Sequence, residues 1–141
     1  MRAALAEALD AGCIGVSSGV DYPPAGPATI GELVDVVSVA ADYEGAVYTA
    51  HIRDEGDAVV DALDEAITTS EQAGVPLVVS HHKCAGPANY GRSADTLALI
   101  DRSPDVHLDL DPYTASSTSL LESFAAAAEQ TIVSWSEPHP E

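Results

Sequence analysis

Apolar residues along this chain concentrate in four short runs that begin about 30 residues apart, at 13–18, 46–51, 76–81 and 106–110. The central part of a run such as 77–79 (Leu-Val-Val) is apolar throughout and does not alternate with polar residues. Such runs are typical of parallel β-strands that are buried on both faces. The interval matches the length of one strand–helix unit, so the pattern predicts four parallel strands, adjacent in chain order, with helices outside the sheet.

The segments between these runs have the spacing of amphipathic helices. Residues 29–32 (Thr-Ile-Gly-Glu) match a capping box, which predicts the start of a helix over 30–43. Apolar residues at helical spacing predict a second helix over 55–73. Ser93 is expected to cap a third helix that runs to residue 102.

Gly12, Gly45 and Gly74 each stand between a helical segment and the next apolar run. Glycine at this place accepts the left-handed backbone that ends a helix. The repeated strand–helix–strand order indicates a parallel α/β sheet, either doubly wound or closed into a barrel. Four units are present, whereas a complete (β/α)8 barrel has eight.

The composition adds a strong negative charge. There are 23 Asp and Glu residues against 5 Lys and Arg, a formal net charge of −18, and the sequence pI is about 4.2. So acidic a surface repels phosphate groups, which excludes nucleic acids and anionic membranes as partners. Repulsion among the acidic side chains opposes folding unless a high salt concentration screens it. The excess of acidic over basic residues therefore points to a protein of a salt-accumulating halophile, with an acidic mesophilic protein as the alternative.

We expect neither a membrane segment nor a targeting signal in this sequence. No run approaches the roughly 18 apolar residues of a membrane helix, and no signal peptide opens the chain. We therefore expect a soluble, cytoplasmic protein. Cys13 and Cys84 are too few for a disulfide framework and are predicted to be small buried hydrophobic residues.

Polar residues follow three of the predicted strands, at the edge of the sheet where active sites of parallel α/β proteins lie. His51 ends the second run and His81 ends the third. Neighbouring strands are about 4.8 Å apart, so the two imidazoles can bind one metal ion, the alternative being two histidines that only form hydrogen bonds. By strand alternation His82 is expected to point away from His81, and the sole lysine, Lys83, follows directly.

Residues 15–19 (Gly-Val-Ser-Ser-Gly) have the G-x-S-x-G spacing of a serine nucleophile elbow. That motif requires a helix immediately after the serine. Here residues 21–24 (Asp-Tyr-Pro-Pro) predict a loop. We therefore do not expect a serine hydrolase.

Six segments, spread along nearly the whole chain between residues 15 and 141, form a further pattern. They are G-V-S-S-G-V-D-Y-P-P-A (15–25), T-A-H-I-R-D-E (49–55), V-S-H-H-K-C-A-G (79–86), N-Y-G-R-S (89–93), D-P-Y-T-A-S-S-T (111–118) and T-I-V-S-W-S-E-P-H-P-E (131–141). In order and spacing they resemble the D-aminoacylase (N-acyl-D-amino-acid deacylase) family of the amidohydrolase superfamily.

The resemblance implies a partial (β/α)8 TIM barrel of the metal-dependent amidohydrolase type, with 1–141 covering about strands four to seven. It implies that His51 and His81 are zinc ligands. It further implies that Lys83, Tyr22 and Ser117 bind the carboxylate and acyl group of the substrate. We also expect Tyr113 to bind the substrate, on the same face of the sheet.

The activity that the resemblance implies is zinc-dependent hydrolysis of the amide bond of N-acyl-D-amino acids. The family's H-x-H motif, its metal-bridging cysteine and its catalytic aspartate have no counterpart in these 141 residues. No catalytic residue is therefore expected in this chain, which is interpreted as a fragment of the barrel. We favour the interpretation that a companion chain completes the barrel; an inactive remnant and a non-enzymatic metal-binding or interaction module are the alternatives.

Overall fold

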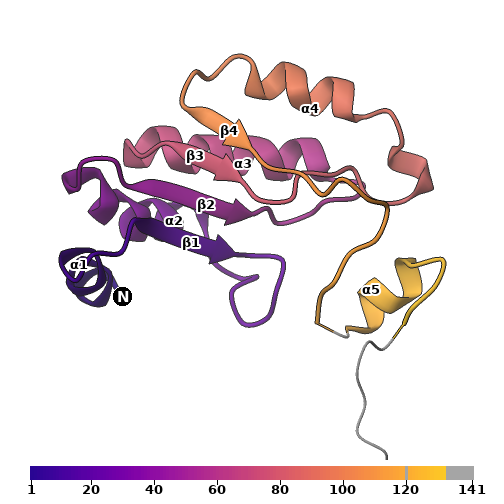
Figure 1. Ribbon diagram of the computed structural model, residues 1–141, viewed down its shortest axis with the longest axis horizontal. Coiled ribbons are helices and arrows are strands. Elements are labelled where there is room, and N and C mark those ends of the chain that lie inside the picture. Colours follow the sequence, from indigo (N-terminus) through magenta and orange to yellow (C-terminus); the bar gives the residue numbers. More distant parts are fainter. Residues whose placement is uncertain (120, 133–141) are drawn as a thin grey trace, which may run out of the picture.

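Four parallel strands form the centre of the molecule. The computed structural model describes residues 1–119 and 121–132, so the predictions for residues 133–141 lie outside the described part. The strands pair in the order β1-β2-β3-β4, all parallel (Figure 1). They are β1 (Gly15–Gly19), β2 (Val47–His51), β3 (Leu77–Val79) and β4 (Val106–Leu108). The predicted parallel sheet and its strand order are confirmed.

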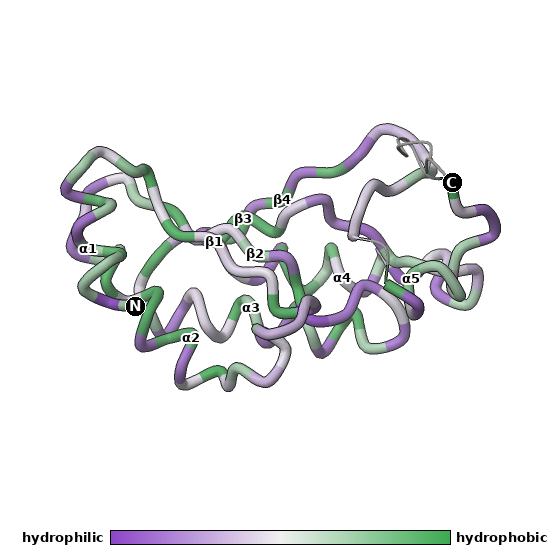
Figure 2. Tube along the Cα trace, turned by 90° about the horizontal axis from the view of Figure 1, so that it is seen from below, coloured by the Kyte–Doolittle hydropathy of each residue, from purple (hydrophilic) through white to green (hydrophobic). Residues whose placement is uncertain are grey.

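Helices connect the strands. They are α1 (Arg2–Asp10), α2 (Ile30–Val37), the 3₁₀ helix η1 (Ser38–Asp42), α3 (Val59–Ala73), the 3₁₀ helix η2 (Pro87–Asn89), α4 (Ser93–Ile100) and α5 (Glu122–Ala127). Helices α2, α3 and α4 lie on one side of the sheet (Figure 2). Helix α3 lies between the other two and contacts both. None of the helices in the described residues is long and apolar enough to span a membrane.

The hydrophobic core lies between α3 and the sheet. Leu63 of α3 and Leu77 and Val79 of β3 are 0% exposed, and Tyr48 of β2 is 1% exposed. Burial of each such side chain contributes roughly 1.5–3 kcal/mol. The Tyr48 hydroxyl shares a hydrogen bond of 2.7 Å with Ser18 Oγ, which satisfies its polar end inside the core.

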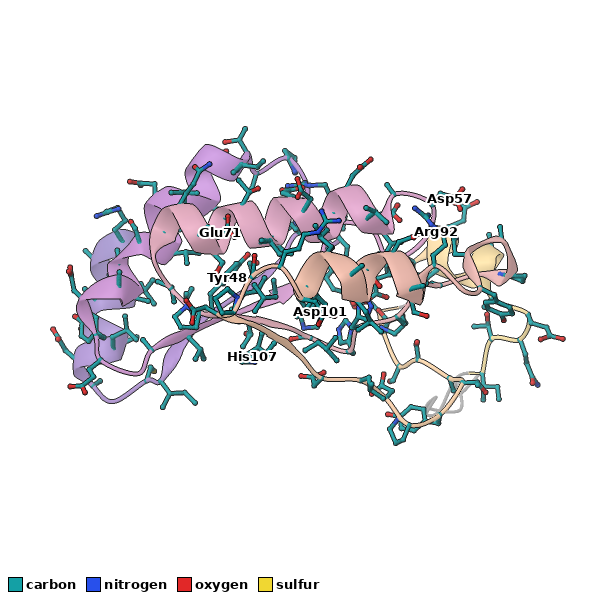
Figure 3. All side chains as sticks on the ribbon, turned by 90° about the horizontal axis from the view of Figure 1, so that it is seen from above. Tyr48, Asp57, Glu71, Arg92, Asp101 and His107 are labelled. Atoms are coloured by element: carbon teal, nitrogen blue, oxygen red, sulfur yellow. The ribbon has the colours of Figure 1, made fainter. Side chains whose placement is uncertain are left out.

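The other face of the sheet is more open than the apolar runs predict. Along β2, Tyr48 and Ala50 are 1% exposed, whereas the alternate residues Val47 and Thr49 are only half-buried. His107 of β4 is exposed and lies on the side of the sheet away from α3 and α4 (Figure 3). The helices thus cover a single face, and the prediction of strands buried on both faces is wrong for the described residues.

The start of α2 is the predicted capping box. The backbone N–H of Glu32 donates to Thr29 Oγ1 (3.3 Å), and the backbone N–H of Thr29 donates to Glu32 Oε2 (2.9 Å). The α-helix ends at Val37 and continues as η1, so the predicted helix over 30–43 is present as two consecutive helices.

Two other predicted helix starts differ from the structure. Helix α3 begins at Val59 and not at residue 55, because Asp54 Oδ1 accepts hydrogen bonds from the backbone N–H groups of Gly56 (2.7 Å) and Ala58 (3.2 Å) and holds a turn. Ser93 is the first residue of α4, and no side-chain hydrogen bond caps that helix. The predicted Ser93 cap is wrong.

The glycines at the helix–strand joints have the predicted left-handed backbone. Their φ angles are 102° at Gly12, 78° at Gly45 and 70° at Gly74. Cys13, directly after the first of them, is exposed, which corrects the prediction that it is buried. Cys84 is half-buried, and both cysteines are free.

Candidate metal and substrate site

Two histidines meet at the carboxyl ends of β2 and β3. His51 is the last residue of β2, and His81 follows β3 by two positions. The distance between His81 Nε2 and His51 Nδ1 is 2.7 Å, and the ring centroids are 4.2 Å apart at an interplanar angle of 77°. The expected convergence of the two rings is observed; their role as zinc ligands stays a prediction.

The backbone of His81 departs from strand geometry to bring the rings together. Ala50 is level with Val79 in the register, and both are buried on the helix side of the sheet. Simple alternation would therefore place His51 opposite Ser80, with His81 on the helix side. The φ angle of His81 is 40°, a left-handed value that costs a non-glycine residue of order 1–3 kcal/mol and is common at functional sites.

Neighbouring groups support this unusual conformation. The carboxylate of Asp109, just after β4, accepts a hydrogen bond from the backbone N–H of His81. The backbone N–H of His82 donates to the carbonyl oxygen of Asp109 (2.8 Å). His82 itself directs Nε2 to Thr96 Oγ1 of α4 at 2.9 Å, so it points to the helix side, away from His81, as predicted.

A carboxylate and an ammonium group complete the cluster. Glu55 Oε1 is 2.9 Å from His81 Nδ1 and 2.9 Å from Lys83 Nζ. Lys83 Nζ is also 2.9 Å from His81 Nδ1. The side chains of His81, Lys83 and Glu55 are 29%, 27% and 24% exposed, so the cluster is largely but not completely withdrawn from solvent.

The pair of histidines fits a zinc ion in its donor atoms. Zinc takes imidazole nitrogens at about 2.0–2.1 Å, and two such nitrogens on a tetrahedral ion are roughly 3.3 Å apart. The observed separation is 2.7 Å, so the two nitrogens would have to move slightly apart to bind one ion. A carboxylate on the second nitrogen of a ligating histidine is the usual outer partner, and Glu55 has that place at His81. Among the described residues, no group of three or more His, Cys, Asp or Glu side chains is arranged to hold a metal.

The loop between β1 and α2 brings Tyr22 to the same edge. Its ring centroid is 6.4 Å from that of His51 and 6.0 Å from that of Phe124 in α5. The Tyr22 hydroxyl shares a hydrogen bond of 2.8 Å with Thr118 Oγ1. Tyr22 therefore lies beside the histidine pair, where a substrate-binding residue is expected.

The adjacent residue, Asp21, is a feature that the sequence did not reveal. Its Oδ1 is buried and has no hydrogen-bond partner among the described residues. The pKa of Asp21 is raised, mainly because burial disfavours the charged carboxylate, and the nearby Glu55 charge adds to the increase. A backbone hydrogen bond and the neighbouring His51 and His81 offset part of it. The carboxyl group thus lies within electrostatic range of the candidate site.

Arg53 anchors this loop, which the sequence did not predict either. Its Nη2 and Nε donate to Oε1 and Oε2 of Glu65 in α3 at 2.6 and 2.8 Å. The guanidinium also donates to the carbonyl oxygens of Gly26 and Ala28. The strand-end residue Arg53 therefore joins the β1–α2 loop to the central helix.

A second network joins the loops that follow β2 and β3. Asn89 Nδ2 donates to Asp57 Oδ1 and to the carbonyl oxygen of Ala85, both at 2.9 Å. Arg92 Nη1 donates to the carbonyl oxygen of Asp57 (2.8 Å) and to Asn89 Oδ1 (3.0 Å). Figure 3 shows Asp57 and Arg92 side by side. The N-Y-G-R segment is thus structural and holds together the two loops that carry Glu55 and Lys83.

The two remaining candidates lie after β4 without contact to the histidines among the described side-chain bonds. Tyr113 is 63% exposed, and its hydroxyl donates to Asp111 Oδ1 at 3.3 Å. Ser117 is exposed. Thr118, one residue further on, is the residue of this segment that bonds Tyr22. Substrate binding by Tyr113 and Ser117 stays a prediction.

Comparison with known proteins identifies the relatives of this chain. It is 48% identical over its whole length to the N-acyl-D-glutamate deacylase, and 44% identical to the N-acyl-D-aspartate deacylase, of Alcaligenes xylosoxydans xylosoxydans. The chain is a homologue of the D-aminoacylases and N-acyl-D-amino-acid deacylases. It spans about 30% of the length of these relatives, 30% of the first and 29% of the second. No family model matches the sequence.

Solved D-aminoacylase structures share the fold of this chain. A D-aminoacylase crystal structure, described as defining a novel subset of amidohydrolases, matches 79% of this chain and 24% of its own at a TM-score of 0.76 and 44% identity. The N-acyl-D-glutamate deacylase of Bordetella bronchiseptica, complexed with zinc and a phosphonate inhibitor, also matches 79% of this chain and 24% of its own, at a TM-score of 0.76 and 42% identity. A further D-aminoacylase structure is described as having a binuclear metal centre. The parallel α/β sheet is therefore the one found in D-aminoacylases.

Proposed function

We propose that this chain forms part of a zinc-dependent amidohydrolase that hydrolyses the amide bond of N-acyl-D-amino acids. In this proposal His51 and His81 bind zinc, and Lys83 binds the carboxylate of the substrate. The observation that carries it is the 2.7 Å approach of two imidazole nitrogens at the carboxyl edge of a parallel sheet, with the sole lysine 2.9 Å from the second ring. The names of the homologues support the substrate class.

The residues of this chain divide between metal binding and substrate binding. Zinc, when bound, supplies the Lewis acidity that activates water near neutral pH. Lys83 has three N–H donors, so its ammonium can retain Glu55 and still bind a substrate carboxylate by a charge-assisted hydrogen bond. Tyr22 lies close enough to His51 to contact the acyl group. No general acid or base is assigned to this chain.

We further propose that the sheet corresponds to about strands four to seven of a (β/α)8 barrel. The open face that carries Val47, Thr49 and His107 would then face the barrel interior, and β1 and β4 would each pair with a further strand. Those strands, with the remaining ligands and the catalytic carboxylate, would come from a companion chain or from sequence outside these 141 residues. The relatives, more than three times as long, support this interpretation.

A chimera tests the proposal. This chain would replace the matching segment of the Alcaligenes N-acyl-D-glutamate deacylase, and hydrolysis of N-acyl-D-amino acids would be measured with zinc present. We expect activity that His51→Ala or His81→Ala abolishes. The control is Glu71→Ala, which removes an exposed side chain of α3, on the outer side of the sheet, and is expected to leave activity intact. A folded chimera that remains active without His51 and His81 contradicts the proposal.

A further inference from the structure

Glu55 occupies the point where the candidate metal site and the candidate substrate site meet. A single oxygen, Oε1, is 2.9 Å from His81 Nδ1 and 2.9 Å from Lys83 Nζ. The backbone carbonyl of Glu55 accepts a hydrogen bond of 2.6 Å from the backbone N–H of Ala85. This bond fixes the main chain at residue 55 independently of the carboxylate, so substitution of the side chain tests the carboxylate alone.

Two neighbours compete for the same nitrogen of His81. Lys83 Nζ and Glu55 Oε1 are both 2.9 Å from His81 Nδ1. An ammonium group can only donate, so a hydrogen bond from Lys83 requires an unprotonated Nδ1 and leaves the ring proton on Nε2. A hydrogen bond to Glu55 requires Nδ1–H and leaves the lone pair of Nε2 free. Only the second tautomer can direct Nε2 to a metal ion.

We propose that Glu55 is the positioning residue that sets the ligating tautomer of His81. This inference rests on the proposed function, in which His81 binds metal through Nε2. Glu55 accepts one hydrogen bond from His81 Nδ1–H and another from the Lys83 ammonium, so the lysine does not donate to the ring. The charge on the carboxylate makes both hydrogen bonds stronger than neutral ones. The same oxygen therefore keeps Nε2 available and holds Lys83 beside it.

Zinc titration of the full chain measures the effect. Calorimetry with zinc alone, with the His51→Ala variant as the baseline for weak binding to surface carboxylates, isolates the histidine site. We expect Glu55→Ala to weaken zinc binding about 10–100-fold, the usual loss when an outer partner of a ligating histidine is removed. Glu55→Gln is expected to lose less, because its amide oxygen can still accept from Nδ1–H.

A double substitution separates tautomer control from a general loss of structure. Without Glu55, Lys83 is the remaining donor close to Nδ1 and stabilises the wrong tautomer. Lys83→Met removes this donor and a positive charge near the metal, so on its own it should strengthen zinc binding. Added to Glu55→Ala, it should recover part of the lost affinity. A double variant that binds zinc no better than Glu55→Ala would overturn the competition between the two neighbours.

The ring proton can also be located without zinc. In the metal-free chain at about pH 8, the ¹⁵N chemical shifts of His81 distinguish a protonated from an unprotonated ring nitrogen. We expect Nδ1–H in the native chain and Nε2–H in Glu55→Ala. An unchanged tautomer in Glu55→Ala would overturn the inference.

Controls distinguish failure of this inference from failure of the proposed function. Glu71→Ala removes a carboxylate near the other end of α3, where it accepts from Ser103 Oγ (2.8 Å), and changes the net charge by the same amount (Figure 3). It is expected to leave zinc affinity unchanged. If His51→Ala and His81→Ala bind zinc as well as the native chain, the proposed function fails. If both lose zinc and Glu55→Ala does not, only the role of Glu55 fails.

Discussion

Arg53 and Glu65 form a two-pronged ion pair across the end of the sheet, with N–O distances of 2.6 and 2.8 Å. Their side chains are 31% and 15% exposed, so the pair is largely withdrawn from water. The same guanidinium binds two carbonyl oxygens of the β1–α2 loop. The position of Tyr22 beside His51 therefore depends on a contact between a strand end and α3.

Arg53→Ala should destabilise the chain by about 2 kcal/mol. It leaves a mostly buried carboxylate on Glu65 and two loop carbonyls without their donor, and unpaired buried groups are costly. Urea unfolding measures the loss. The matched control is Arg2→Ala, which breaks the ion pair with Asp35; those side chains are 51% and 65% exposed. That loss should be no more than about 0.5 kcal/mol, and equal losses would contradict the anchoring role of Arg53.

The chain alone should not hydrolyse N-acetyl-D-methionine, even with zinc and molar salt. Catalytic zinc sites usually have three protein ligands, whereas the proposed site has only His51 and His81, and the described residues contain no group of three or more. The catalytic aspartate of the family, which is expected to supply general acid–base catalysis worth about 10²–10⁴ in rate, has no counterpart in these 141 residues. Zinc-dependent turnover by the purified chain that His51→Ala abolishes would show that the site is complete. Turnover that survives this substitution would indicate a contaminating enzyme.

Potassium chloride should stabilise the chain. With a net charge of −18, repulsion between surface carboxylates opposes the compact state and is screened as the ionic strength rises. Between about 0.1 and 2 M salt we expect a gain of at least about 1 kcal/mol, or roughly 4 °C in Tm. A parallel series in sucrose, which stabilises without screening charge, is the control. A Tm that does not change with salt would argue against a halophilic protein.

Asp21→Asn should stabilise the chain at neutral pH. Burial raises the pKa of Asp21, so the folded state disfavours the ionised carboxylate relative to the unfolded state. The penalty is present above the folded pKa and disappears as the pH falls below the unfolded value of about 3.8. The gain, up to about 1 kcal/mol because solvent partly screens the group, should therefore be largest near pH 7 and vanish in acid.

The control for this substitution is Asp64→Asn, on the exposed side of α3, which removes an equal charge. It should change stability little and without the same dependence on pH. If Asp21→Asn and Asp64→Asn give the same gain at every pH, the effect comes from the net charge and not from the buried position of Asp21.

The sequence predicted well the features that depend on local pattern. The apolar runs predicted four parallel strands in the correct order, and Gly74 and the Thr29–Glu32 box marked a helix end and a helix start. The contact between His51 and His81 could be predicted because each histidine ends an apolar run, one repeat apart. The left-handed backbone of His81 that makes the contact possible could not be predicted, because it depends on support from Asp109 at the end of the next strand.

Contacts between charged side chains and distant loops could not be predicted from pattern. The partners of Arg53 are 12 to 27 residues away along the chain. The partners of the Glu55 carboxylate, Lys83 and His81, are 28 and 26 residues away. Long side chains can satisfy their charge in many ways, so spacing alone does not select one. Ser93 shows the converse: a residue with a strong local preference for capping has no capping bond in the folded chain.

The network of Asp57, Asn89 and Arg92 has a consequence for how such chains change over evolutionary time. It couples the loop after β2 to the loop after β3 through bonds to both side chains and backbone. An insertion or deletion in either loop would move its half of the network away from the other. Among homologues, the lengths of these two loops should therefore vary together.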